Sequence, residues 1–160
     1  MRLSYLVRGW PGHPSHPPLT AVTIGAYTAA IIAAIIHFAG TGDPEMAKAA
    51  GFLIQVGLIS TLPVAITGIV DWVKMPRRTP VWTTGLLHLI VVAVATVLFR
   101  VGCVFDGTFQ KGVIPTRNFA LILLAYAVMA AGGWLGGKIV FVFGHRVLAA
   151  ETVLGDVRAR

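Results

Sequence analysis

The sequence predicts an all-α integral membrane protein, a four-helix bundle whose helices run up-down-up-down. The chain has 160 residues, of which 56% are hydrophobic and 12% are charged, whereas a soluble domain has about 25% charged residues. The apolar residues fall into four runs, each long enough to cross a membrane, which takes about 20 residues. These features exclude a soluble enzyme, a disordered chain and, with Cys103 as the single cysteine, a secreted disulfide scaffold.

The four spans divide the chain into a single membrane domain, residues 1–160. They are predicted at about residues 19–39, 49–73, 82–105 and 118–143. Short links rich in glycine and proline separate them, and short links favour antiparallel neighbours in a bundle. Residues 147–160 are mildly amphipathic and are predicted to form a tail on the membrane surface.

Pro63 lies inside the second span. Because proline has no N–H, it cannot donate a hydrogen bond to the carbonyl of Ile59, so a kink is expected there. The hydroxyl of Ser60 or Thr61 is expected to satisfy the freed carbonyl.

The positive charges indicate how the chain is oriented. The formal net charge is +7, and the basic residues gather in the segments between apolar runs, which is typical of membrane orientation and not of nucleic-acid binding. The N-terminus, the second link and the C-terminal tail carry Arg2, Arg8, Lys74, Arg77, Arg78, Arg146, Arg158 and Arg160, against Arg100, Lys48, Lys111 and Arg117 on the other side. This asymmetry predicts that both termini are cytoplasmic in a multi-pass protein of the bacterial plasma membrane.

Ionisable side chains are costly in hydrocarbon, at roughly 2.5–3.5 kcal/mol each on insertion scales, so they mark candidate functional positions. His88 is the clearest, because it lies about six residues into the third span, which is ~9 Å of helix. Threading the chain through the four spans brings most of these residues to the cytoplasmic end, whereas His37 lies toward the opposite face. The residues at the cytoplasmic end are His13, His16, Asp71, His88 and His145.

This cluster is compatible with three kinds of chemistry. Two imidazoles on different helices, His88 with His145 or His16, could ligate one haem b from opposite faces. Asp71 with His13, His16 and His88 could instead hold a divalent transition metal, or a His–Asp pair could pass protons. The same residues could also bind no cofactor and simply fix the helices.

Glycines in the fourth span add to the candidate site. They form two overlapping G-x-x-x-G pairs, which let a neighbouring helix or a flat cofactor approach closely. Gly133 and Gly137 are therefore counted with the cofactor-binding residues. Lys138, on the same helix, could neutralise Asp71 or a haem propionate, or extend to the lipid head groups.

Several short motifs occur in order along the chain. They are Gly12-His13-Pro14-Ser15-His16-Pro17, Gly68-Ile69-Val70-Asp71, His88, and the run from Gly136 to Gly144. Together they resemble a bacterial membrane family catalogued as domain of unknown function 2231. The resemblance implies a small four-helix membrane protein, and some members are joined to Rieske-type domains, which suggests electron transfer.

One position departs from that family pattern. Members often carry histidine directly before the glycine that is Gly144 here, whereas this chain has Phe143 there and His145 after it. A shift of two residues turns a side chain by about 200° around a helix. The resemblance therefore supports His145 least among the expected ligands.

The sequence thus favours a membrane redox protein, or a subunit of a redox complex, that binds one haem b or a metal near the cytoplasmic end for electron transfer. The alternatives are a non-catalytic anchor subunit within a larger membrane complex and a protein that translocates protons or a metal. The expected partners are the lipid bilayer and either another membrane protein or a second copy of the chain. Whether the protein is an enzyme is left open.

Overall fold

A computed structural model describes residues 5, 7, 9–10, 13–104 and 109–147. The four long helices are α2 (His16–Ile36), α3 (Pro44–Val73), α4 (Pro80–Val104) and α5 (Thr116–Gly137). Single π-helical turns, η1 (His37–Thr41) and η2 (Lys138–Val142), extend α2 and α5. Before α2, the short strands β1 (Gly9–Trp10) and β2 (His13–Pro14) form an antiparallel pair.

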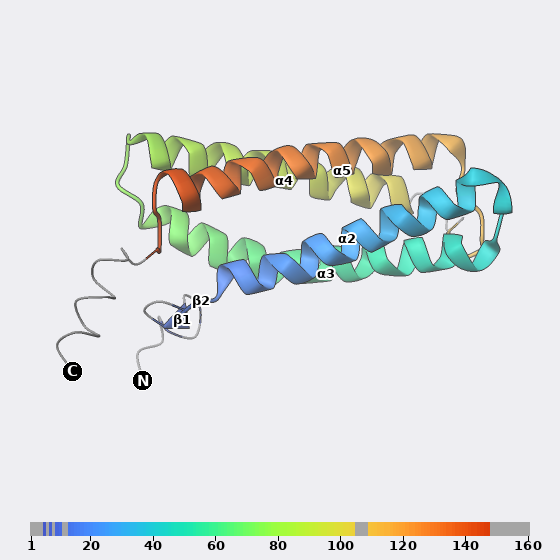
Figure 1. The fold of residues 1–160 in the computed structure, drawn as a ribbon, viewed down its shortest axis with the longest axis horizontal. Helices are drawn as coiled ribbons and strands as arrows, with labels where there is room; N and C mark the ends of the chain where they lie inside the picture. Colours follow the sequence, from blue (N-terminus) through green and yellow to red (C-terminus); the bar gives the residue numbers. More distant parts are fainter. Residues whose placement is uncertain (1–4, 6, 8, 11–12, 105–108, 148–160) are drawn as a thin grey trace.

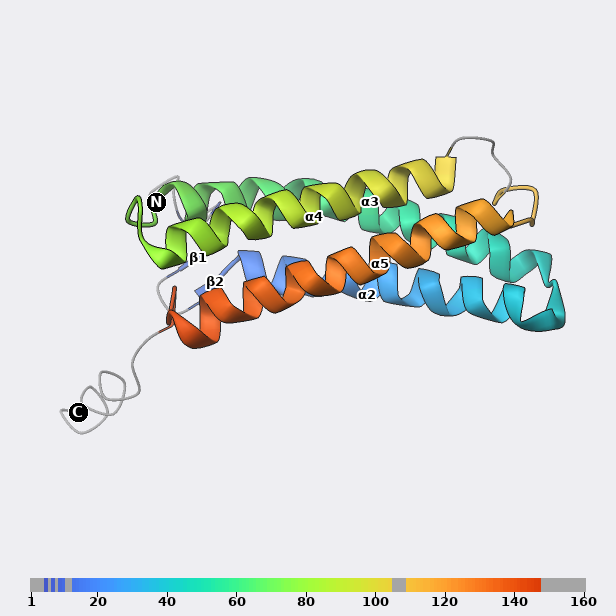
Figure 2. The same cartoon turned by 90° about the horizontal axis from the view of Figure 1, so that it is seen from above.

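The helices form two antiparallel hairpins, α2–α3 and α4–α5, which lie side by side (Figure 1). The hairpins meet mainly between α3 and α4, with a sparser contact between α2 and α5 (Figure 2). This confirms the predicted all-α bundle of antiparallel helices. All four helices are long and apolar enough to cross a membrane, over His16–Gly40, Pro44–Val73, Pro80–Cys103 and Thr116–Val142.

Each long helix begins two to five residues before the predicted start of its span. Prolines are the reason in three of them, because a proline in the first turn has the right backbone angle and needs no N–H partner. At the start of α3, the side chain of Asp43 also accepts a hydrogen bond of 2.9 Å from the backbone of Glu45. One consequence matters for the site: His16, which was expected before the first helix, is the first residue of α2. The predicted surface tail lies, beyond Val147, outside the described residues.

The helix α3 continues through Pro63 as one element. The hydroxyls of Ser60 and Thr61 donate to the carbonyl of Gly57, at 3.0 and 2.8 Å. They therefore bond two residues away from the partner expected from sequence, the carbonyl of Ile59.

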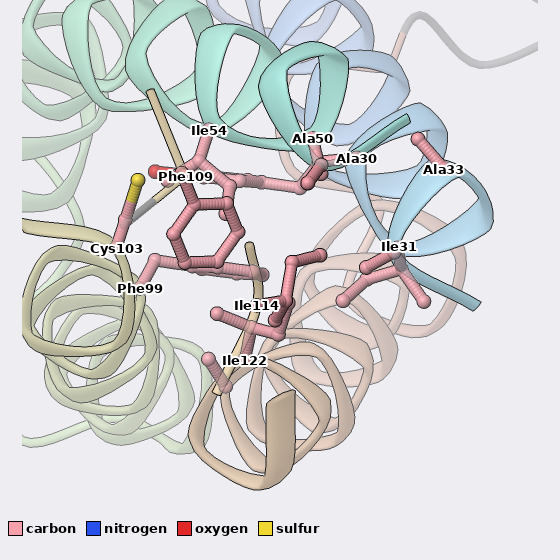
Figure 3. Packing of buried hydrophobic residues seen from close by; sticks show 14 of the residues in the cluster. Ala30, Ile31, Ala33, Ala50, Ile54, Phe99, Cys103, Phe109, Ile114 and Ile122 are labelled. Atoms are coloured by element: carbon pink, nitrogen blue, oxygen red, sulfur yellow. The ribbon is translucent and has the colours of Figure 1, made fainter. Parts of the chain in front are cut away.

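The half of the bundle that includes the link between α4 and α5 is closely packed, and we call it the closed half. Ile54, Phe99, Phe109 and Ile122 are fully buried there and converge from different parts of the chain (Figure 3). The ring of Tyr27 stacks on Phe99 with 3.9 Å between ring centroids. Because lipid is as apolar as these side chains, it is this close packing, rather than exclusion from water, that holds the helices together.

Candidate functional site

The other half of the bundle, where α2 begins and η2 ends, contains a cavity of about 340 Å³ between the two hairpins, and we call it the open half. The cavity is bordered by residues from all four long helices and from the segment that follows η2. Among its lining residues are His16, Asp71, His88, Gly133, Gly137 and His145. The structure therefore gathers around one cavity all six residues that the sequence singled out for a cofactor.

His16 is held by the neighbouring helix of its own hairpin. Its Nδ1 atom lies 3.1 Å from the carbonyl oxygen of Val64 and 3.0 Å from the hydroxyl oxygen of Thr67, both on α3. The ring rests on Gly68, where a methyl group would come within 2.9 Å of Cε1 of the imidazole. The glycine thus makes the room that lets the imidazole lie against α3.

His88 is held in the same way in the second hairpin. Its Nδ1 atom lies 2.8 Å from the carbonyl oxygen of Gly132 on α5. The ring rests on Gly136, where a methyl group would come within 3.2 Å of Cε1.

The two arrangements match position by position. In each hairpin a histidine on the first helix bonds to a backbone carbonyl of the second, and a glycine four residues after that carbonyl accommodates the ring. A carbonyl oxygen can only accept a hydrogen bond, so these contacts favour the tautomer of a neutral imidazole with its proton on Nδ1. The lone pair is then on Nε2, which is the state in which a histidine ligates iron or a metal ion.

The glycines of α5 have two different roles. A methyl group at Gly132 would lie 2.8 Å from Val92, so this glycine permits close contact with α4. By contrast, a methyl group at Gly133 would meet no other atom within 4 Å, and one at Gly137 would meet only the ring of Phe141, at 3.9 Å. Gly132 therefore serves helix packing, whereas Gly133 and Gly137 line the cavity without a close neighbour.

The carboxylate of Asp71 is nearly buried at the wall of the cavity, and its basic partner is Arg146. The Nε atom of Arg146 lies 4.0 Å from Oδ2 of Asp71, and their side chains are 22% and 10% exposed. Arg146 has a left-handed backbone (φ 65°), which is uncommon outside glycine. Lys138, which was considered for this role, instead lies over the ring of Phe143, 5.7 Å from its centroid.

His145 reaches the cavity although the predicted helix does not extend to it. The last regular residue of α5 is Gly137, and η2 follows with the wider π-helical turn. Gly144 then takes a left-handed backbone (φ 61°), and the N–H of His145 donates to the carbonyl of Ile139 at 3.1 Å. The chain leaves helical geometry at this point, so the helical rotation used to judge His145 from the sequence does not apply.

The metal set expected from sequence is not assembled as a cluster. His13 lies in β2 and is exposed, and it is not among the residues that line the cavity. Among the described residues, no group of three or more His, Cys, Asp or Glu side chains is close enough to hold a metal ion. His37 lies at the other end of α2, as expected, where its Nδ1 contacts the carbonyl oxygen of Asp43 at 2.8 Å.

Arg146, Trp72 and Met75 are among the site residues that sequence reasoning missed. Arg146 had been counted only as a topological charge, although it directly follows His145. Trp72 and Met75 also line the cavity, beyond the end of the motif that closes with Asp71. The spacing of four residues between Asp71 and Met75 was the available signal for Met75; the adjacent position of Trp72 gave none.

Comparison with known sequences gives the family. Residues 12–149 match the family described as "Predicted membrane protein (DUF2231)". The chain belongs to this family. Its matched segment contains every cavity residue named above, and the chain is a multi-pass membrane protein. Neither a curated protein nor a solved structure gives a significant match.

Proposed function

We propose that this chain is a redox protein of the bacterial plasma membrane that binds one haem b in the open half, at the cytoplasmic end of the bundle. In this proposal, Nε2 of His16 and Nε2 of His88 would hold the haem iron. The observation that carries it is their shared arrangement: each ring lines the cavity and has Nδ1 bonded to a backbone carbonyl, so Nε2 retains its lone pair.

The number of nearby ligands favours haem over a simple metal ion. The porphyrin itself supplies four nitrogen ligands, so a haem needs only one or two axial residues from the protein. A divalent ion bound by the protein alone needs three or four protein ligands, which the described residues do not bring together. The two imidazoles, one on each hairpin and each oriented by a backbone carbonyl, match the one or two protein ligands that a haem needs.

The remaining lining residues suit a flat, anionic group. Gly133 and Gly137 leave a surface without side chains on α5, so a flat ring system can lie against the backbone. Arg146 can donate paired hydrogen bonds to a carboxylate at the cavity wall. Asp71 lies 4.0 Å from that guanidinium and provides a nearby opposite charge. When bound, haem b supplies reversible one-electron chemistry, and the protein tunes its potential through the axial ligands and their hydrogen bonds.

The test is a visible spectrum, oxidised and then reduced with dithionite, of protein purified in mild detergent from cells supplied with a haem precursor. We expect sharp reduced α and β bands. They should be lost in His88→Ala and in His16→Ala, and retained in the matched control His37→Ala. Loss in His145→Ala with retention in His16→Ala would reassign the second ligand.

A featureless spectrum from folded, haem-supplied protein would contradict the proposal. Two alternatives would then be tested next. Co-purification of a stable membrane complex would support an anchor subunit. Flux of protons or of a divalent metal into liposomes, abolished by Asp71→Asn, would support a carrier.

A further inference from the structure

A second hollow, of about 390 Å³, lies at the link between α3 and α4. Its walls are two tryptophans, two arginines and a valine: Trp72, Val73, Arg77, Arg78 and Trp82. Trp72 also lines the cavity of the candidate site, so this residue borders both the cavity and the second hollow.

The two tryptophans form a fixed pair at the end of two candidate membrane spans. Nε1 of Trp72 donates a hydrogen bond of 3.1 Å to the carbonyl oxygen of Trp82. The two rings lie 5.1 Å apart between centroids and are tilted by 31°. Tryptophan is enriched at the depth of the lipid head groups, where its ring contacts the acyl boundary and its N–H is satisfied.

The arginines bring unbalanced positive charge to the same hollow. The link between Val73 and Trp82 contains no acidic residue, and both Arg77 and Arg78 are exposed. No described acidic side chain forms an ion pair with either of them. Arg78 also has a left-handed backbone (φ 61°), a strained state for a residue with a Cβ that is often found where a side chain must be held for a ligand.

We propose that this hollow binds the phosphate of an anionic phospholipid head group. The guanidinium groups of Arg77 and Arg78 would donate hydrogen bonds to the phosphate oxygens, which they can do in pairs because each is planar. The tryptophan pair would contact the glycerol and upper acyl region of the same lipid. The position at the end of two spans favours a lipid over a soluble anion, because the lipid phosphate is held at this depth. The proposal requires neither haem nor a particular orientation of the chain.

The experiment uses the full chain in lipid nanodiscs, with Trp10→Phe and Trp134→Phe so that only Trp72 and Trp82 fluoresce. Quenching by brominated phosphatidylglycerol is compared with quenching by brominated phosphatidylcholine. We expect a preference of about 30-fold for phosphatidylglycerol, which corresponds to about 1 kcal/mol for each arginine near the surface. Arg77→Gln with Arg78→Gln should abolish that preference.

A matched pair of substitutions at the other end of the bundle, Lys111→Gln with Arg117→Gln, removes the same charge and should leave the preference intact. Circular dichroism and the emission maximum of the two tryptophans show whether each variant is folded. Equal quenching by the two lipids, or a preference that survives the double arginine substitution, would overturn the proposal. A preference that is removed by millimolar inorganic phosphate would assign the hollow to free phosphate and would also overturn it.

Discussion

Glycines let side chains approach closely in both halves of the bundle, but in the open half some glycines also border the cavity with no close neighbour. A methyl group at Gly51 would lie 2.7 Å from Phe109, and one at Gly102 would lie 2.8 Å from Ile122. In the open half, Gly133 has no such neighbour within 4 Å. Glycine therefore serves close packing in both halves, and in the open half it also leaves room beside the cavity.

The two halves also differ in the side chains at their centres. The imidazoles of His16 and His88 are on the walls of the open half, each bonded to a backbone carbonyl. The closed half has the stacked rings of Tyr27 and Phe99 instead. We expect the closed half to contribute most of the stability and, under the proposed function, the open half to bind the haem. Substitutions in the two halves should therefore have different effects.

The largest loss of stability is expected from Phe99→Ala, because this ring is fully buried and stacked on Tyr27. Deleting it should lower the free energy of unfolding by about 3–5 kcal/mol. The matched control is Phe52→Ala, at a ring that is 68% exposed and faces lipid. Reversible unfolding in mixed detergent micelles measures both, and equal losses would contradict a specially packed closed half.

A smaller loss is expected from Gly57→Ala. The added methyl group would lie 2.5 Å from Cε1 of Tyr27, so the ring must move out of its stack. Such overpacking costs about 1–3 kcal/mol. Gly25→Ala is the control, since no atom lies within 4 Å of the added group there. Thermal unfolding in one detergent should separate the two variants, and a stable Gly57→Ala protein would show that the core can repack.

The contact between Asp71 and Arg146 should contribute about 0.5–1 kcal/mol, because its atoms are 4.0 Å apart and the arginine side chain is 22% exposed. A double-mutant cycle of Asp71→Asn with Arg146→Gln measures this coupling directly. The same cycle with Lys138→Gln should give a coupling near zero, because Lys138 lies over Phe143. Coupling to the lysine alone would reverse the assignment.

The smallest effect on stability is expected from Gly133→Ala with Gly137→Ala. Both methyl groups enter open space, so the free energy of unfolding should change by less than about 0.5 kcal/mol. The haem content of the purified protein, in contrast, should fall, because the cavity loses its flat wall. If haem content is unchanged while His88→Ala abolishes it, the ligand binds elsewhere around His88.

Much of the site could be predicted because depth along a span can be counted from sequence. Counting placed Asp71, His88 and His145 at one end, and the cavity there is lined by all three. Counting failed where the chain leaves regular geometry. The π-helical turn and the left-handed Gly144 interrupt the α-helical geometry after α5, so the positions of His145 and Arg146 do not follow helical rotation.

Partners across helices were also beyond sequence reasoning. Lys138 was one of several possibilities for pairing with Asp71, and the structure places Arg146 beside that carboxylate. Helical spacing cannot tell which of two cations reaches a carboxylate on another helix. The sequence pattern also could not show that Gly132 contacts α4 whereas Gly133 lines the cavity, since both belong to G-x-x-x-G pairs of identical spacing.

The sequence by itself determined that this is a four-helix membrane protein and which end holds its ionisable residues. The reason is that charge and unpaired backbone are costly in lipid, so long apolar runs must form spanning helices. Only the tertiary structure decided how those residues are used. The proton on each imidazole is placed by a carbonyl on another helix, Val64 for His16 and Gly132 for His88. Such a contact depends on how two helices pack, which no local pattern of residues encodes.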